Sequence, residues 1–325
     1  MAKRRIRWGR VLAAMIGLSC SIFIADGIKR DMHRSNTSNI KVEGDFVGDQ
    51  ISDKKADKQS DETLQLGLIN TKMPSTTTEG VQNLGFSELS IPDSKLSTGM
   101  LAIINNEHPA GTSSDQKRVN LLKYKNEFYS LVSENVKLNE EAAEALNNMM
   151  AAYNEATGLS DFIVYGTNDT YTGDGSSCPE YFPESAAGNT IDLALNAGGS
   201  IIAFDGYDTE GWIIDNCEKY GFIVRYPKGK EAKTKHDFCP WHLRYVGGVH
   251  AAIMDEKDMC LEEYIDFLKG FSFDKSFSYA YNGVNYEIYT SPAKNSAEPA
   301  RVPVSGTYTV SGDNIGTFII TTVKN

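Results

Sequence analysis

A cysteine and a histidine stand three residues apart in the stretch HDFCPWHLRYVG, residues 236–247. Thiolate and imidazole are both accepted zinc ligands, so Cys239 and His242 could belong to a metal site with Asp192 as a third ligand. The imidazole could instead activate the thiol as a nucleophile, as in cysteine peptidases. The residue types in this stretch therefore indicate either metal chemistry or thiol chemistry.

A disulfide is the third interpretation of Cys239. Three further cysteines follow the N-terminal region, Cys178, Cys217 and Cys260. Four cysteines allow three pairings, and the sequence does not choose among them. A bond from Cys239 to Cys178 would close the long polar loop that leads into residues 183–192.

Three segments must position these side chains. The runs at 222–227 (FIVRYP) and 239–247 (CPWHLRYVG) are short, apolar and bounded by Gly or Pro, which is typical of buried strands. The run at 190–196 (TIDLALN) alternates apolar and polar residues, and it carries Asp192. If these strands pair, Asp192 and His242 come close together, and Arg225 and Tyr226 on the neighbouring strand help to aim His242. Arg244 could neutralise an acid, but the sequence names no partner for it.

The remaining patterns predict both helices and strands. Apolar residues at helical spacing predict a helix over 139–156 that ends at Gly158, with Met149 and Met150 in the core. Amphipathic helices are expected over 209–221 and 260–271. Strands are expected near 99–104, 161–166, 200–206, 286–291, 306–312 and 316–323. Helices and strands do not alternate regularly, so we expect an α+β fold, mainly an antiparallel sheet with flanking helices.

The N-terminal segment resembles a membrane anchor. Residues 1–10 hold five basic side chains and no acid, and the apolar run at 11–28 follows. By the positive-inside rule we expect a single-pass signal-anchor at 11–28, with the basic end in the cytoplasm and the rest outside the membrane. The sequence does not decide whether this segment is cleaved.

Composition divides the rest of the chain. Residues 29–95 are polar and rich in Ser, Thr, Asp and Lys, which predicts a disordered extracytoplasmic linker. A folded domain is expected over 96–272, followed by a β extension over 273–325. The net charge of −11 argues against nucleic acid as a partner, since such binding depends on clustered Lys and Arg.

The order of these segments resembles the D-alanyl-D-alanine carboxypeptidases of the vancomycin-resistance type, zinc peptidases with a hedgehog-like core. The resemblance is carried by WIIDNCEKYGFIVRYPKGK, PWHLRYVGGVHAAIM and CLEEYIDFL, together with Gly188 and Asp192. It covers roughly residues 98–272. The resemblance implies that the folded domain has the hedgehog-like core of these zinc peptidases.

The resemblance also assigns site residues. In the family a Ser-x-His-x-x-Gly-x-Ala-x-Asp motif supplies two zinc ligands, and a Glu-Pro-Trp-His motif supplies the general base and the third ligand. The alignment leaves Asp192 and His242 at ligand positions, but Ser185 stands where a zinc histidine is expected. Cys239 stands at the general-base position. Asn168 or a neighbour falls where the family has an arginine for the substrate carboxylate.

These replacements imply a protein that has lost hydrolysis. A hydroxyl is a poor zinc ligand, and a positioned base typically contributes ~10²–10⁴-fold in rate. We therefore expect a pseudoenzyme without zinc that binds a peptidoglycan stem peptide or an envelope protein. The alternative is an active carboxypeptidase in which Asp192, Cys239 and His242 hold zinc in a shifted arrangement. A purely structural envelope protein is a third possibility.

Overall fold

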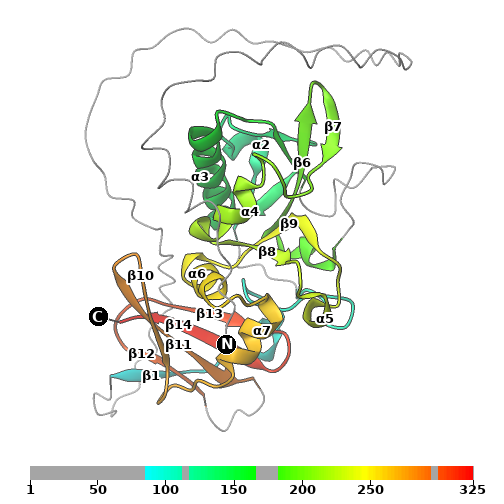
Figure 1. Ribbon diagram of the computed structural model, residues 1–325. Coiled ribbons are helices and arrows are strands. Elements are labelled where there is room, and N and C mark those ends of the chain that lie inside the picture. The colour runs from blue at the N-terminus through cyan, green and yellow to red at the C-terminus, as the bar shows by residue number, and fades with distance from the viewer. Residues whose placement is uncertain (1–84, 112–116, 166–181, 294–298, 325) are drawn as a thin grey trace, which may run out of the picture. The chain divides into compact units, whose positions relative to one another are not determined.

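The computed structural model describes residues 85–111, 117–165, 182–293 and 299–324 (Figure 1). The expected basic end, the anchor and the linker up to residue 84 lie outside these residues, as do Asn168 and Cys178. Within the described ranges, no helix is long and apolar enough to cross a membrane. The fold is α+β, and all but one of the strand pairs named below are antiparallel, as expected.

The largest sheet positions the residues of the 236–247 stretch. Its strands run in the order β3-β5-β6-β9-β8, and β7 pairs with the far end of β6. Only β3 and β5 are parallel. Apart from β3, which the sequence did not predict, the strands match runs predicted above. They are β3 (Ser130–Leu131), β5 (Phe162–Tyr165), β6 (Thr190–Ala197), β7 (Ser200–Ala203), β8 (Phe222–Tyr226) and β9 (Cys239–Tyr245).

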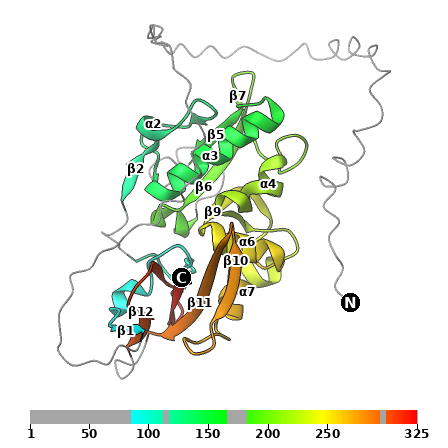
Figure 2. The same ribbon diagram turned by 90° about the vertical axis from the view of Figure 1, so that its left-hand side faces the viewer.

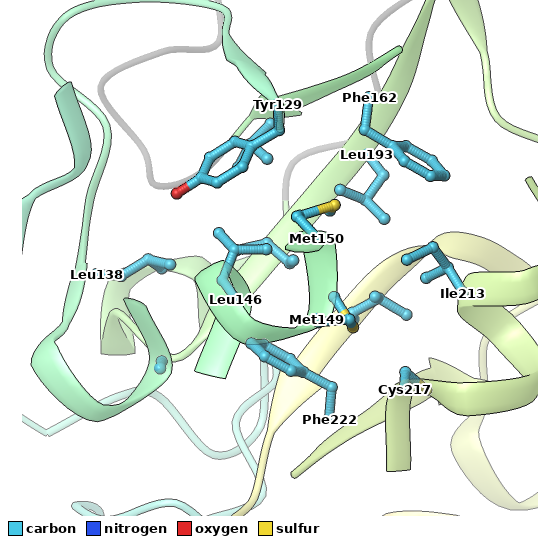
Figure 3. Close-up of a cluster of buried hydrophobic side chains, with 14 of the residues drawn as sticks. Tyr129, Leu138, Leu146, Met149, Met150, Phe162, Leu193, Ile213, Cys217 and Phe222 are labelled. Carbon is cyan, nitrogen blue, oxygen red and sulfur yellow. The ribbon is translucent and has the colours of Figure 1, made fainter. Parts of the chain in front are cut away.

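The helix α3 (Glu140–Thr157) packs on this sheet and confirms the longest helix prediction (Figures 1 and 2). Two glutamates occupy its first turn, where the helix dipole favours acids, and Gly158 ends it in a left-handed conformation with φ of 75°. Figure 3 shows Met149 and Met150 among the side chains of the core between α3 and the sheet, and both are fully buried. Both methionines therefore pack in the core, as predicted.

Shorter elements surround this core. The expected helix at 209–221 begins later, as α4 (Trp212–Asn216), and tightens into the 3₁₀ turn η4 (Cys217–Tyr220) before Gly221. The predicted helix at 260–271 is α7 (Leu261–Leu268). The sequence patterns did not predict the remaining short elements. These are β2 (Arg118–Asn120), α2 (Leu121–Tyr124), β4 (Lys137–Asn139), α5 (Glu231–Thr234) and α6 (Gly248–Glu256).

The C-terminal strands form a second sheet in the order β10-β11-β14-β13. A buried apolar cluster joins α6 and α7 to β11 and β14 of this sheet. Gly248 permits close contact there, because a Cβ atom would lie 2.9 Å from the ring of Tyr281. The strands are β10 (Phe277–Tyr281), β11 (Val284–Pro292), β13 (Tyr308–Gly312) and β14 (Thr317–Val323).

The segment before residue 96 is ordered in part. The strand β1 (Phe86–Leu89) pairs with β12 (Ala300–Pro303), and the 3₁₀ turn η1 (Asp93–Lys95) follows. The expected linker to residue 95 is therefore too long, since residues 86–95 join the folded part. The alternating run FSEL is only four residues long, and β1 pairs with a strand that lies far along the chain. Local pattern alone therefore did not predict this strand.

The strand expected near 99–104 is not formed. Leu101 and its neighbours are buried, but their backbone groups bond to side chains and to a distant loop. Arg244 donates to the carbonyls of Met100 and Ala102, at 3.0 and 2.7 Å. The amide of Leu101 donates to Ser311 Oγ, and that of Ile103 donates to the Asp313 carbonyl. These bonds replace a strand ladder.

Two of the four cysteines are free thiols. Cys217 lies in the main core, and Cys260 precedes α7, where its amide donates to Glu263. The fully oxidised set that the sequence allowed is therefore not formed. A bond from Cys239 to Cys178 stays a prediction, because Cys178 lies outside the described residues.

Candidate functional site

The three predicted segments meet at His242. Strand β9 lies between β6 and β8, and Asp192 of β6 stands directly opposite His242 in the antiparallel register. The turn η3 (Pro183–Ala187) leads into β6 and ends at Gly188, whose φ is 74°. A side chain there would also approach Arg118 and Asn139 to about 3 Å, so the turn requires glycine. The local geometry therefore places η3, β6 and β9 at one point.

His242 is held between two carboxylates. Its Nδ1 lies 2.5 Å from Asp192 Oδ1, and its Nε2 lies 3.0 Å from Glu184 Oε1. Ionised carboxylates only accept hydrogen bonds, so both ring nitrogens must donate, which requires the imidazolium form. Burial disfavours that cation, but Asp192 and Glu184 outweigh the effect and raise the pKa of His242 to about 9.

Glu184 connects His242 to two buried arginines. It accepts from Arg225 Nε at 3.1 Å and from Arg244 Nη1, and its other oxygen accepts from the Tyr226 hydroxyl at 3.0 Å. Burial would raise the pKa of Glu184, but the arginines and His242 hold it well below its usual range. Glu184 is therefore an anion at neutral pH.

The charges of this group balance. We call His242, Asp192, Glu184, Arg225 and Arg244 the His242 cluster. Arg225 also forms a bidentate pair with Glu262, at 3.1 and 2.7 Å. With Glu262 included, three carboxylates face three cations, and every member except Glu262 is at most 2 % exposed. Such pairing offsets the large cost of removing ions from water.

Ser185 lies beside Glu184 and remains outside the cluster. Its side chain is 1 % exposed, and its Oγ has no hydrogen-bond partner among the described residues. The position that the resemblance assigns to a zinc histidine therefore holds a buried hydroxyl. An oxygen of this kind is a weak donor to zinc compared with an imidazole.

Cys239 lies among aromatic side chains. It is 3 % exposed and shares a buried cluster with Phe182, Tyr226 and Trp241. Its Sγ is 3.5 Å from His236 Nδ1, and that nitrogen also lies 3.1 Å from the Asp237 carbonyl. A nitrogen that donates to a carbonyl is protonated and cannot take the thiol proton. The contact between Cys239 and His236 is therefore a poor nucleophile–base pair.

The ring of Phe182 lies against the imidazole of His242. Its ring centroid lies 4.0 Å from that of His242, and Tyr226 stacks on the same imidazole at 5.6 Å. Phe182 is 2 % exposed. The imidazole therefore meets aromatic carbon on its faces and carboxylate oxygen at both nitrogens.

The donors at this site do not fit a catalytic zinc ion. A metal would have to displace His242 from its contacts with Asp192 and Glu184. The remaining donors would be Asp192, the Ser185 hydroxyl and Glu184, which already accepts from Arg225 and Arg244. Within the described residues, no group of three His, Cys, Asp or Glu side chains could hold a metal ion. The shifted arrangement of Asp192, Cys239 and His242 is thus not assembled as a metal centre there.

Several residues of the site were not singled out from the sequence. Asp192 and His242 come together as expected, whereas Glu184 and Phe182 were passed over, and Arg244 had no named partner. A signal was present, because arginines in apolar strands such as FIVRYP are buried only when an acid pairs with them. Glu184 is the one acid in the short stretch between Pro183 and Asp192.

Comparisons with known proteins agree with this geometry. The family model "VanY: D-alanyl-D-alanine carboxypeptidase" matches residues 184–248, which run from Glu184 to the start of α6. A D-alanyl-D-alanine carboxypeptidase of Enterococcus faecium is 34% identical over 260 residues, which cover 75% of this chain and 82% of the relative. A putative carboxypeptidase, YodJ, of Bacillus subtilis (strain 168) is 42% identical over 88 residues, 26% of this chain and 32% of that protein.

A solved structure shares the fold. It is the vancomycin-resistance D,D-dipeptidase VanXYg in complex with a D-Ala-D-Ala phosphinate analogue, with a TM-score of 0.60 and 22% identity. The match covers 74% of this chain and 99% of that one. From the match over most of the Enterococcus faecium enzyme, the chain belongs to the VanY family of D-alanyl-D-alanine carboxypeptidases.

Proposed function

We propose that this family member no longer hydrolyses peptides and instead binds peptidoglycan stem peptides that end in D-Ala-D-Ala. The observation that carries the proposal is the state of His242, fully buried with both nitrogens on carboxylates. Ser185 and Cys239 at the positions of a ligand and the base support it. The N-terminal anchor expected at 11–28 would hold the protein at the outer face of the cell membrane.

The chemistry of the family explains why hydrolysis is lost. A catalytic zinc ion generates its nucleophile by lowering the pKa of a bound water to about 7. That requires a metal with an open coordination position and a base that receives the proton. Here both imidazole nitrogens contact carboxylates, a hydroxyl stands at one ligand position, and a buried cysteine stands at the base position.

The scaffold supports retained binding. The pairs of Glu184 with Arg225 and Arg244 hold the turn η3 and strands β8 and β9 together, which supports a fold that could still surround a stem peptide. The solved relative with the same fold binds a D-Ala-D-Ala phosphinate analogue. We therefore extend D-Ala-D-Ala recognition, without cleavage, to this chain.

Metal content and D-alanine release test the loss of hydrolysis. We expect the purified full-length protein to contain no stoichiometric zinc and to release no D-alanine from a stem pentapeptide. The double variant Ser185→His/Cys239→Glu restores the family's ligand and base, and we expect it to gain zinc. Zinc gained in this way should disappear when His242→Ala is added.

The opposite result would identify an enzyme. Stoichiometric zinc in the unaltered protein that is lost with Cys239→Ser, together with D-alanine release, would support the shifted Asp192, Cys239 and His242 centre. Binding is tested separately by titration with a stem pentapeptide and with the tetrapeptide that lacks the terminal D-alanine. We expect saturable binding of the pentapeptide only, and equal or absent binding of the two peptides contradicts the proposed recognition.

A further inference from the structure

A cavity of about 570 Å³ lies apart from the His242 cluster. Separate parts of the chain line it: the segment from β1 to residue 101, Lys117, residues 139–141 at the start of α3, Tyr245 with His250, and strands β13 and β14. No member of the His242 cluster contributes to its lining. Its walls are largely apolar, with Leu89, Ile91, Met100, Leu101, Val310 and Ile319. A volume of this size suits a small molecule or a single side chain with its backbone.

Two glutamates at the start of α3 also line this cavity, and they differ in their partners. Glu140 forms an ion pair with Lys117 at 2.6 Å. Glu141 is half-buried and makes no ion pair or hydrogen bond within the described residues. Burial first, and then Glu144 and Glu140, raise the pKa of Glu141. Within the described residues, the cavity therefore contains one acid that no side-chain cation pairs with, and only the helix dipole at the start of α3 favours its charge.

The other polar side chains of the lining do not supply a cation for Glu141. Lys117 is committed to Glu140, and Lys95, the other lysine of the lining, is engaged elsewhere. Burial raises the pKa of Tyr245, and the charges of Glu141 and Glu144 raise it further, so Tyr245 lies within the field of these glutamates. A carboxylate in such surroundings is stabilised by a cation that brings its own hydrogen-bond donors.

We propose that this cavity binds an amphipathic organic cation, with an apolar body against the walls and a primary ammonium group paired with Glu141. The apolar lining contributes affinity through burial of the ligand body, while the single uncompensated carboxylate selects the charge. A neutral analogue would leave Glu141 without a partner, and an anion would be repelled by Glu140 and Glu141. This site goes beyond the binding of stem peptides at the family site.

Fluorescence titration of the full-length protein with dansylcadaverine tests the proposal, because this probe joins an aromatic body to an alkyl primary ammonium. We expect saturable binding with enhanced emission. The analogue that ends in a hydroxyl should bind about tenfold or more weakly, since a charge-assisted hydrogen bond contributes ~1.5–3 kcal/mol. Glu141→Gln should weaken the amine by a similar factor.

The variant Glu144→Gln is the matched control. It removes the same charge from the same helix, but Glu144 is exposed and does not line the cavity, so we expect less than about a twofold change. Glu141→Lys should reverse the preference toward the carboxylate analogue of the probe. Absent saturation, equal binding of amine and alcohol, or equal losses in the Glu141 and Glu144 variants would each overturn the proposal.

Discussion

Among the residues that the structure describes, two histidines are buried, His242 and His250, and they are in opposite charge states. Both are enclosed, at 0 % and 3 % exposed. His242 contacts carboxylates at both nitrogens, and its pKa is raised to about 9. His250 contacts hydroxyls instead, with Nδ1 2.7 Å from the Tyr264 oxygen and Nε2 3.1 Å from Thr321 Oγ1. Burial lowers the pKa of His250 to about 4, so it is neutral.

The difference shows that partners decide the charge of a buried imidazole. Burial disfavours the cation in both cases, and only the two carboxylates beside His242 reverse its effect. The His242 cluster is thus a closed electrostatic unit of paired ions. The surroundings of His250, between α6, α7 and β14, form a packing junction without an ion pair to the histidine.

Removal of the shared anion should have the largest effect. In Glu184→Gln, three buried cations lose their common partner, and breaking a buried pair costs about 3–5 kcal/mol. We expect a loss of that size in the free energy of unfolding at pH 7, measured by chemical denaturation. The control Glu287→Gln breaks the exposed pair with Lys324 and should cost far less. Equal losses would refute the idea of a closed electrostatic unit.

Alkaline pH should destabilise the protein through His242. The folded state binds this proton more tightly than the unfolded chain, so the stabilisation is complete below about pH 6.5 and is lost as pH rises through about 9. Between pH 6 and 9 the free energy of unfolding should fall by about 3 kcal/mol, in chelator-treated protein. The variant His242→Gln should lack this slope. An unchanged slope would mean that His242 is neutral.

Acid should act through His250 with the opposite sign. Its folded-state pKa lies below that of the unfolded chain, so its contribution is present above about pH 6.5 and declines as pH falls toward 4. Between pH 7 and 5 the expected loss is about 2 kcal/mol. Since other carboxylates titrate in this range, the comparison is with His250→Gln. A variant that loses stability in parallel with the unaltered protein would contradict a neutral His250.

The fold was predictable where the pattern was local. The helix that ends at Gly158 and the strands around FIVRYP and CPWHLRYVG follow from periodicity and from glycine or proline at the ends. The segment near Leu101 misled the prediction, because its apolar residues are buried while its backbone bonds to Arg244, Ser311 and Asp313. The pairing of β1 with β12 depends on residues that lie far apart in the chain.

The sequence predicted the family positions of the site, but it did not predict the ion pairs of the His242 cluster. Asp192 and His242 follow from motif spacing, and the register of β6 and β9 places them opposite each other. Glu184 carries no motif role, and its contacts with His242 and both arginines join segments far apart in the chain, so the sequence did not predict them. The contact between Cys239 and His236, in place of a paired base, likewise depends on where the aromatic rings pack.

The smallest expected effect comes from two residues with positive φ in the backbone near the two histidines. Lys235 precedes the strand of His242 with φ of 58°, and Asp258 follows the helix of His250 with φ of 50°. A lysine in this region is strained, whereas aspartate tolerates it better because its short side chain bonds locally. We expect Lys235→Gly to raise the free energy of unfolding by about 0.5–1 kcal/mol and Asp258→Gly to raise it less. Both variants should keep the two pH slopes, since neither alters a partner of His242 or His250, and a changed slope would show that the charge states depend on backbone strain.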